Sequence, residues 1–164
     1  MIKVIDDFLT EDEFFPVWKT LMGPYMVWHY NSYVTDKGNP NNGFQFISYF
    51  FRHNDGFIGR HTNLIQPYCD KLGARQLIRI KANLRVRDTK RTREDYHVDF
   101  NLPCKSAIAY INTNNGYTEF ETGEKVNCVA NRVVIFDSHM RHAGVTCTDQ
   151  NTRVVLNFNY FDYL

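Results

Sequence analysis

The sequence predicts an α+β fold, in which early helices pack on one sheet of an antiparallel sandwich or jelly roll. Helical spacing of apolar residues is confined to the first 72 residues, whereas apolar and polar residues alternate with period two from residue 77 onward. The 164 residues are 43% hydrophobic and 15% aromatic, which is enough for one core. Because no linker or repeat interrupts the chain, we expect residues 1–164 to form a single domain.

The first expected elements are a strand and a capped helix. Residues 2–5 form a short β-branched run, as in a strand. Thr10 and Glu13 match a capping box, in which Thr10 accepts from the Glu13 amide and Glu13 reaches back. A Gly-Pro pair at 23–24 stops the helix. Its apolar face is expected to contain Phe14, Phe15, Val17, Trp18, Leu21 and Met22.

A second helix, a loop and a strand are expected before residue 77. The helix should run from Asp55 to Leu72 and end at Gly73, with its inward face formed by Ile58, Leu64, Ile65 and Tyr68. Residues 35–43 have the composition of a loop, because they are rich in Asn, Gly, Asp and Pro. Residues 44–51 follow this loop as a strand.

The second half of the chain is predicted to consist of strands. Residues 77–87 and 152–160 alternate clearly, and shorter strands are expected over 104–112, 117–121, 125–129 and 132–137. The apolar faces of the two long strands should meet the helices. Their opposite faces carry Arg79, Lys81, Asn83, Arg85, Arg153, Asn157 and Asn159. A dry barrel could not bury so many polar groups without partners, so this face is either solvated or lines a wet functional cavity.

Charge and composition exclude several classes of protein. The net charge is +1, from 19 basic and 18 acidic residues, so no global field favours nucleic acid or an anionic membrane. The apolar runs are far shorter than the roughly 18 residues of a membrane helix. The N-terminus lacks the features of a signal peptide, and the four cysteines are widely spaced, as in a protein with reduced thiols. We therefore expect a cytoplasmic protein.

Three separated motifs carry the candidate chemistry. His97 and Asp99 are two apart, so in a strand they present an imidazole and a carboxylate on one side. A distant histidine, His139 or His142, follows an apolar strand, and Arg153 lies eleven residues beyond His142 on the polar face. Two histidines and one carboxylate form the facial site that holds non-haem Fe(II) and leaves three positions open. Zinc also accepts these ligands, so a zinc hydrolase is a possible alternative.

With these motifs the sequence resembles the Fe(II)- and 2-oxoglutarate-dependent oxygenases, in particular the small prolyl-4-hydroxylase-like branch of bacteria and phages. The resemblance covers most of the chain, and it departs from the family pattern at two places. A single glycine stands at Asn115-Gly116, and Asn83 or Arg85 stands where a tyrosine is usual. The matching segments are residues 2–10, His97-x-Asp99, 110–112, 116–120, 131–136, His142-x-Gly144 and Arg153.

The resemblance implies a double-stranded β-helix that binds Fe(II) through His97, Asp99 and His142, rather than His139. It also implies 2-oxoglutarate as cosubstrate, with its distal carboxylate on Arg153, O2 as oxidant and ascorbate as reductant. Oxidative decarboxylation would give succinate and CO2 and would hydroxylate a C–H bond. Further cosubstrate contacts are expected from Asn83, Tyr110, Thr118 and Asn157.

The primary substrate is expected to be a peptide or protein residue, for example a prolyl residue. An oxidative nucleic-acid demethylase is a second hypothesis, because basic residues are frequent over 85–93. A non-enzymatic, cupin-like barrel that binds a metal or a ligand is a third. Specificity is expected to lie in residues 30–43 and 87–95. Structural positions are expected for His29, His53 and His61.

Overall fold

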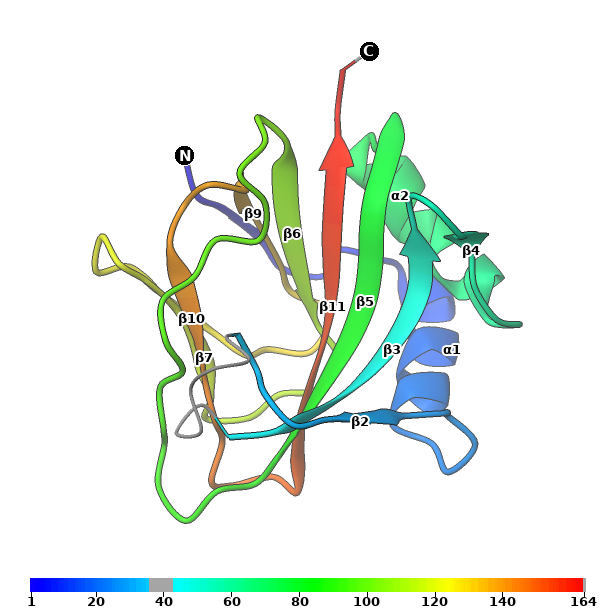
Figure 1. Cartoon of the computed structure of the whole chain (residues 1–164). Coiled ribbons are helices and arrows are strands. Elements are labelled where there is room, and N and C mark those ends of the chain that lie inside the picture. Colours follow the sequence, from blue (N-terminus) through cyan, green and yellow to red (C-terminus); the bar gives the residue numbers. More distant parts are fainter. Residues whose placement is uncertain (36–42, 164) are drawn as a thin grey trace.

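The computed structural model describes residues 1–35 and 43–163, and these residues form two antiparallel sheets with helices on one side (Figure 1). The larger sheet has the strand order β1-β9-β6-β11-β5-β3-β2, with β4 paired to β3, and the smaller sheet has the order β10-β7-β8. The elements are β1 (Lys3–Ile5), α1 (Glu11–Leu21), β2 (His29–Asn31), β3 (Gln45–Arg52), β4 (Gly56–Phe57), the short 3-10 helix η2 (Thr62–Leu64), α2 (Gln66–Leu72), β5 (Gln76–Val86), β6 (Lys105–Tyr110), β7 (Tyr117–Phe120), β8 (Lys125–Asn127), β9 (Val133–Asp137), β10 (His142–Val145) and β11 (Thr152–Phe161).

The two sheets face each other as a jelly roll, which confirms the predicted fold class. Apolar side chains fill one part of the space between the sheets. Phe120 of β7 and Val126 of β8 pack there against residues of the larger sheet, namely Ile108, Tyr110, Val134, Phe136 and Val155. The remaining interior is polar and contains the candidate site. The alternating residues of β5 and β11 therefore place one face of each strand in the apolar core with the helices. The other face lines the space between the two sheets, as predicted.

The helices cover the outer face of the larger sheet, as predicted (Figure 1). Thr10 caps α1 in a complete capping box with Glu13. Val17 and Leu21 are buried in the core formed with β5 and β11. Phe15 and Trp18, which we expected on the apolar face, are 54% and 40% exposed and stack on each other. The buried stripe of this 11-residue helix is narrower than the predicted face.

The predicted helix from Asp55 to Leu72 is wrong over its first part. Residues 56–57 instead form β4, which pairs with β3 as a hairpin. Gly56 and Gly59 have φ values of +71° and +81°, which helical residues do not adopt. Helical structure is limited to η2 and α2, and α2 ends at Gly73 in the left-handed conformation, as expected.

Other boundaries agree closely with the predicted strands. The turns between strands use Asn131 at φ +62° and Gly123 at φ +103°. The strands β2, β4 and β10 were not predicted. Of the predicted loop at 35–43, residues 36–42 lie outside the described residues. The four cysteines are buried and free. Among the described residues, no helix is both long enough and apolar enough to cross a bilayer.

Candidate active site

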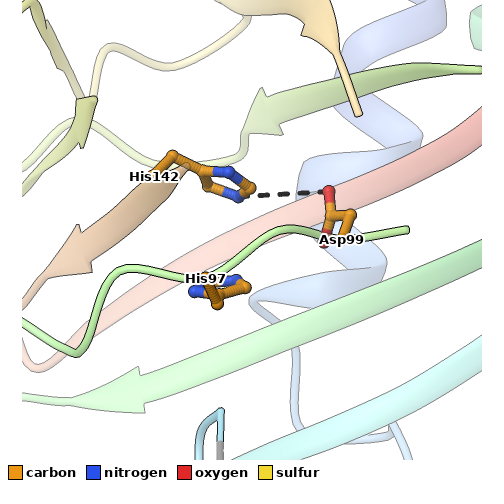
Figure 2. A group of neighbouring side chains, drawn as sticks. All are labelled: His97, Asp99 and His142. Atoms are coloured by element: carbon orange, nitrogen blue, oxygen red, sulfur yellow. Dashed lines mark ion pairs between the residues drawn. The ribbon is translucent and has the colours of Figure 1, made fainter. Parts of the chain in front are cut away.

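The side chains of His97, Asp99 and His142 meet in the interior of the jelly roll. Figure 2 shows His142 on β10, facing His97 and Asp99 on a separate segment. The candidate ligand atoms of the three residues lie within 4.8 Å of one another, and His142 Nε2 is 4.0 Å from Asp99 Oδ2. The alternative histidine, His139, is exposed and lies outside this group. Residues far apart in the chain are therefore brought to one point.

The backbone around His97 and Asp99 differs from our expectation of a strand. His97 forms only an isolated antiparallel bridge with His142, and Asp99 lies in a bend. Two backbone hydrogen bonds close the bridge, from His97 N to His142 O at 3.0 Å and from His142 N to His97 O at 2.9 Å. The bridge places the two imidazole centroids 4.6 Å apart. Asp99 is directed inward by side-chain hydrogen bonds and not by the alternation of a strand.

Both imidazoles are oriented by backbone carbonyl groups. His97 Nδ1 lies 3.2 Å from the carbonyl oxygen of Asp95, and His142 Nδ1 lies 3.0 Å from that of Met140. A carbonyl oxygen only accepts, so each Nδ1 carries the proton and each Nε2 keeps its lone pair. Burial and the neighbouring His142 lower the pKa of His97, which favours the neutral form. Neutral Nε2 is the form of imidazole that binds a metal ion.

Asp99 is a buried carboxylate with four side-chain donors, and its side chain is only 3% exposed. Arg79 Nη2 and Asn157 Nδ2 donate to Oδ1 at 3.1 and 3.3 Å. Ser106 Oγ and Asn159 Nδ2 donate to Oδ2 at 2.8 and 3.1 Å. Burial acts to raise the pKa of Asp99, but the Arg79 guanidinium and the hydrogen bond from the Ser106 hydroxyl act to lower it, and the pKa lies below its ordinary value. The carboxylate is therefore ionised and fixed in position.

Arg153 is a buried cation of β11, with 6% of its surface exposed. Its Nε donates to Cys128 Sγ at 3.2 Å, and its Nη2 donates to Thr118 Oγ1 at 3.3 Å and to the Tyr117 carbonyl at 3.5 Å. The Tyr110 hydroxyl donates to Thr118 Oγ1 at 2.8 Å, behind the guanidinium. Within residues 1–35 and 43–163, no carboxylate forms an ion pair with Arg153. A buried charge without a counter-ion is costly, so this position favours an anionic ligand.

One cavity of about 70 Å³ connects these groups. It is lined by His97, Asp99 and His142 on one side and by Arg153 and Thr118 on another. Its further polar lining residues are Gln45, Lys81, Asn83, Arg85, Glu94 and Asn157. With neutral histidines, the three cations and two anions of the lining give a net charge of +1. The cavity therefore attracts anions even before a metal ion binds.

Two glycines that carried the sequence resemblance lie where a side chain would collide. A Cβ atom on Gly116 would lie 2.7 Å from the Val145 carbonyl oxygen and 3.0 Å from Arg153 Cδ. A Cβ atom on Gly144 would lie 2.9 Å from Glu94 Oε2. These positions thus keep space for the cation on one side and for the Glu94 carboxylate on the other.

Two asparagines line the cavity with their amide orientations fixed by neighbours. Asn157 donates its Nδ2 to Asp99, which can only accept. Asn83 donates its Nδ2 to Gln45 Oε1 at 2.6 Å, because Gln45 Nε2 is held by the backbone carbonyls of residues 33–34. Asn83 therefore forms its hydrogen bond with Gln45 and not with Asp99. The Oδ1 atoms of both asparagines are buried and have no hydrogen-bond partner among the described residues.

Sequence reasoning did not assign the residues that hold the aspartate. Alternation had placed Arg79 and Asn159 on the polar faces of their strands, but no signal paired them with Asp99. Ser106 gave no signal, since it is one small polar residue in an apolar strand.

In the basic run over residues 85–93, Arg85 forms a largely buried ion pair with Glu94, with an N–O distance of 3.0 Å.

Comparison with solved structures identifies the fold. An oxidoreductase of the 2OG-Fe(II) oxygenase family from Burkholderia pseudomallei matches with a TM-score of 0.73 and 13% identity, over 99% of this chain and 85% of that one. A Trichoplax adhaerens prolyl hydroxylase, in complex with a peptide fragment of hypoxia inducible factor, matches with a TM-score of 0.70 and 13% identity, over 98% and 83%. HygX from Streptomyces hygroscopicus, with nickel and 2-oxoglutarate bound, matches with a TM-score of 0.61 and 11% identity, over 98% and 82%. No protein-family model and no curated protein sequence matches the chain.

The fold and the side-chain group define a double-stranded β-helix protein with a candidate metal site of two histidines and one aspartate. More particularly, the fold is that of the 2-oxoglutarate- and Fe(II)-dependent oxygenases, prolyl hydroxylases among them. The resemblance noted in the sequence is thus confirmed at the level of the fold. Sequence identities of 11–13% show a similar fold only. Evidence for an activity and for the roles of single residues comes from the cavity.

Proposed function

We propose that this protein is an Fe(II)- and 2-oxoglutarate-dependent dioxygenase that hydroxylates a C–H bond and releases succinate and CO2. One observation carries the proposal: a single cavity contains the three candidate metal ligands and a buried arginine with no ion pair among the described residues. We further propose that residues 1–164 act as one oxygenase domain. Localisation in the cytoplasm stays a prediction.

His97, Asp99 and His142 are the proposed Fe(II) ligands. Their candidate ligand atoms lie within 4.8 Å of one another, so one ion would contact all three after small side-chain shifts. The ligand set is complete, since both Nε2 atoms are free and the carboxylate is ionised. Fe(II) bound there together with 2-oxoglutarate and O2 would supply the oxidising chemistry, with ascorbate as reductant.

Arg153 is the proposed partner of the distal carboxylate of 2-oxoglutarate. Thr118 and Tyr110 support this role, because Thr118 contacts the guanidinium and Tyr110 holds Thr118. A carboxylate at this position would give the buried cation its counter-ion through charge-assisted hydrogen bonds. Asn83 and Asn157, expected among the cosubstrate contacts, each use one of their two side-chain N–H groups, and their Oδ1 atoms need a donor, which 2-oxoglutarate does not offer. We therefore assign their free oxygens to another molecule below.

For the primary substrate we propose an amino acid, either as a residue of a peptide or protein or as the free acid. The Trichoplax adhaerens enzyme of the same fold is in complex with a peptide. A nucleic-acid substrate is less well supported, because two arginines of the basic run, Arg85 and Arg93, are paired with Glu94 and Glu119. These ion pairs reduce the positive charge that would follow a phosphate backbone.

Succinate and CO2 release from 2-oxoglutarate, measured with Fe(II), ascorbate and O2, tests the proposal. We expect turnover in the wild type and none in Asp99→Ala. Iron content should fall in His142→Ala and be retained in His139→Ala, which is the matched control. Turnover that persists in Asp99→Ala would contradict the proposal. Binding of metal and 2-oxoglutarate without turnover would favour the cupin-like, non-enzymatic barrel. Zinc in a purified sample would not decide between metals, because zinc displaces Fe(II) from such ligands.

A further inference from the structure

Lys81 presents an unpaired cation to the cavity. It lies on β5 opposite Asn157 of β11 and lines the same space as the candidate metal ligands. Arg79 and Arg85, its neighbours on this face of β5, form ion pairs with carboxylates. Within the described ranges, no residue accepts a hydrogen bond or forms an ion pair with the Lys81 ammonium group. Burial and Arg79 lower its pKa to about 8, so it is mostly protonated at neutral pH.

Two unpaired acceptors lie beside this cation. The Oδ1 atoms of Asn83 and Asn157 are buried, no group within residues 1–35 and 43–163 donates a hydrogen bond to them, and both residues line the cavity. Reversing either amide would turn its oxygen towards an acceptor, Gln45 Oε1 in one case and the Asp99 carboxylate in the other. The two free oxygens therefore follow from the hydrogen-bond network.

2-Oxoglutarate does not satisfy these acceptors. At neutral pH it is a dianion whose oxygens only accept hydrogen bonds, so it offers nothing to the Asn83 and Asn157 oxygens. Arg153, on another part of the wall, already provides a counter-ion for one of its carboxylates. The unpaired cation and the two unpaired acceptors together fit a second molecule that carries both an anionic group and hydrogen-bond donors.

We infer that the primary substrate is a free α-amino acid, whose carboxylate pairs with Lys81 and whose ammonium group donates to the Asn83 and Asn157 oxygens. This inference rests on the proposed function and narrows it. A residue inside a peptide has neutral amides in place of both charged groups, so it would leave Lys81 unpaired. Recognition of both ends of the amino acid would hold its side chain near the candidate metal ligands, where the reacting C–H bond must lie.

The test compares three forms of each common L-α-amino acid: the free acid, the C-terminal amide and the N-acetyl derivative. Succinate formation is measured above the background without amino acid. Binding is measured by calorimetry to protein loaded with Mn(II) and 2-oxoglutarate in the absence of O2. We expect at least one free amino acid to bind and to stimulate turnover, and its amide to lose about 30-fold or more in kcat/KM.

Lys81→Met should lower kcat/KM for the free acid by a similar factor. The variant should then act on the free acid and on its amide with similar kcat/KM. Its KM for 2-oxoglutarate should stay within about threefold of the wild type, because Arg153 is unchanged. Lys81→Gln is a second variant that keeps a polar head group, and Lys3→Met, an exposed lysine on β1, is the control. Melting curves establish that each variant is folded.

Three results would overturn the inference while the proposed function stands. In the first, the amide or N-acetyl forms stimulate turnover as well as the free acids do. In the second, none of the free amino acids binds or stimulates turnover. In the third, Lys81→Met weakens 2-oxoglutarate binding and leaves amino-acid binding unchanged. Failure of the wild type to bind or consume 2-oxoglutarate would instead contradict the proposed function itself.

Discussion

Replacement of Arg153 by methionine should weaken cosubstrate binding without destabilising the metal-free protein. The guanidinium is 6% exposed, and its hydrogen-bond partners among the described residues are neutral groups, at 3.2 to 3.5 Å. Methionine has a comparable length and no charge, so it can fill the same space in an apolar manner. The variant therefore separates the cost of burying the cation from its use in binding an anion.

The magnitudes can be worked out from these contacts. An ion buried without a counter-ion costs several kcal/mol, whereas hydrogen bonds from a charged donor contribute about 1.5–3 kcal/mol each at ideal length and less at 3.2 to 3.5 Å. The balance favours the methionine variant by about 1–3 kcal/mol, or about 2–10 °C in Tm for a domain of this size. Loss of one partner of a buried charge pair weakens binding by about 2–5 kcal/mol, which is about 30-fold or more.

Thermal melts of the metal-free protein, with and without 2-oxoglutarate, measure both effects. A ligand at about 100 times its Kd stabilises the wild type by about 2.7 kcal/mol, and the variant should show no such shift at that concentration. Arg60→Met, at an exposed arginine outside the cavity, is the control and should resemble the wild type. A lower Tm in Arg153→Met together with an unchanged 2-oxoglutarate shift would refute the reasoning.

Three further substitutions give distinct expected outcomes. The pKa of Lys81 is lowered from 10.5 to about 8, so the protonated side chain destabilises the fold below about pH 8, and this effect is lost as the pH rises from about 8 to above about 10.5. Urea unfolding should therefore find Lys81→Met more stable than the wild type at neutral pH, by up to about 3 kcal/mol, with this gain lost near pH 11. Gly116→Ala should lower the free energy of unfolding by about 1–3 kcal/mol and weaken 2-oxoglutarate binding, because its Cβ meets Arg153; an unchanged calorimetric Kd would contradict this. Arg79→Met should weaken Fe(II) binding by about 10- to 100-fold in a chelator competition, since it removes the charged one of the two donors to Asp99 Oδ1, and wild-type affinity would argue against this role.

Alternation along single strands predicted the part of the site that lies on β5 and β11. Each of these strands is long and has one apolar face, so its period fixes which side chains enter the interior. Arg153 and Lys81 were placed on the correct face by this reasoning alone. The apolar faces also predicted correctly that the helices cover the larger sheet.

Local patterns failed where long-range contacts decide the backbone. The segment from Tyr96 to Phe100 has the spacing of a strand, yet His97 pairs only with His142, and Asp99 leaves the ladder to reach donors on three strands. Similarly, β10 is a four-residue strand whose pairing with β7 no local pattern indicated. Residues 55–65 carried helical spacing, but the left-handed glycines and the β3–β4 hairpin prevailed.

The hydrogen-bond capacity of the cavity could not be predicted from sequence, because an amide is oriented by neighbours on other strands. The Asp99 carboxylate, an acceptor only, turns Asn157 so that its oxygen is free. Two backbone carbonyls turn Gln45, and Gln45 in turn fixes Asn83. Each step occupies one N–H of an asparagine amide and leaves the amide oxygen without a partner among the described residues. A cavity with two cations lacking carboxylate partners among the described residues and two free acceptors is suited to two different ligands, one of which offers only acceptors while the other must also offer donors.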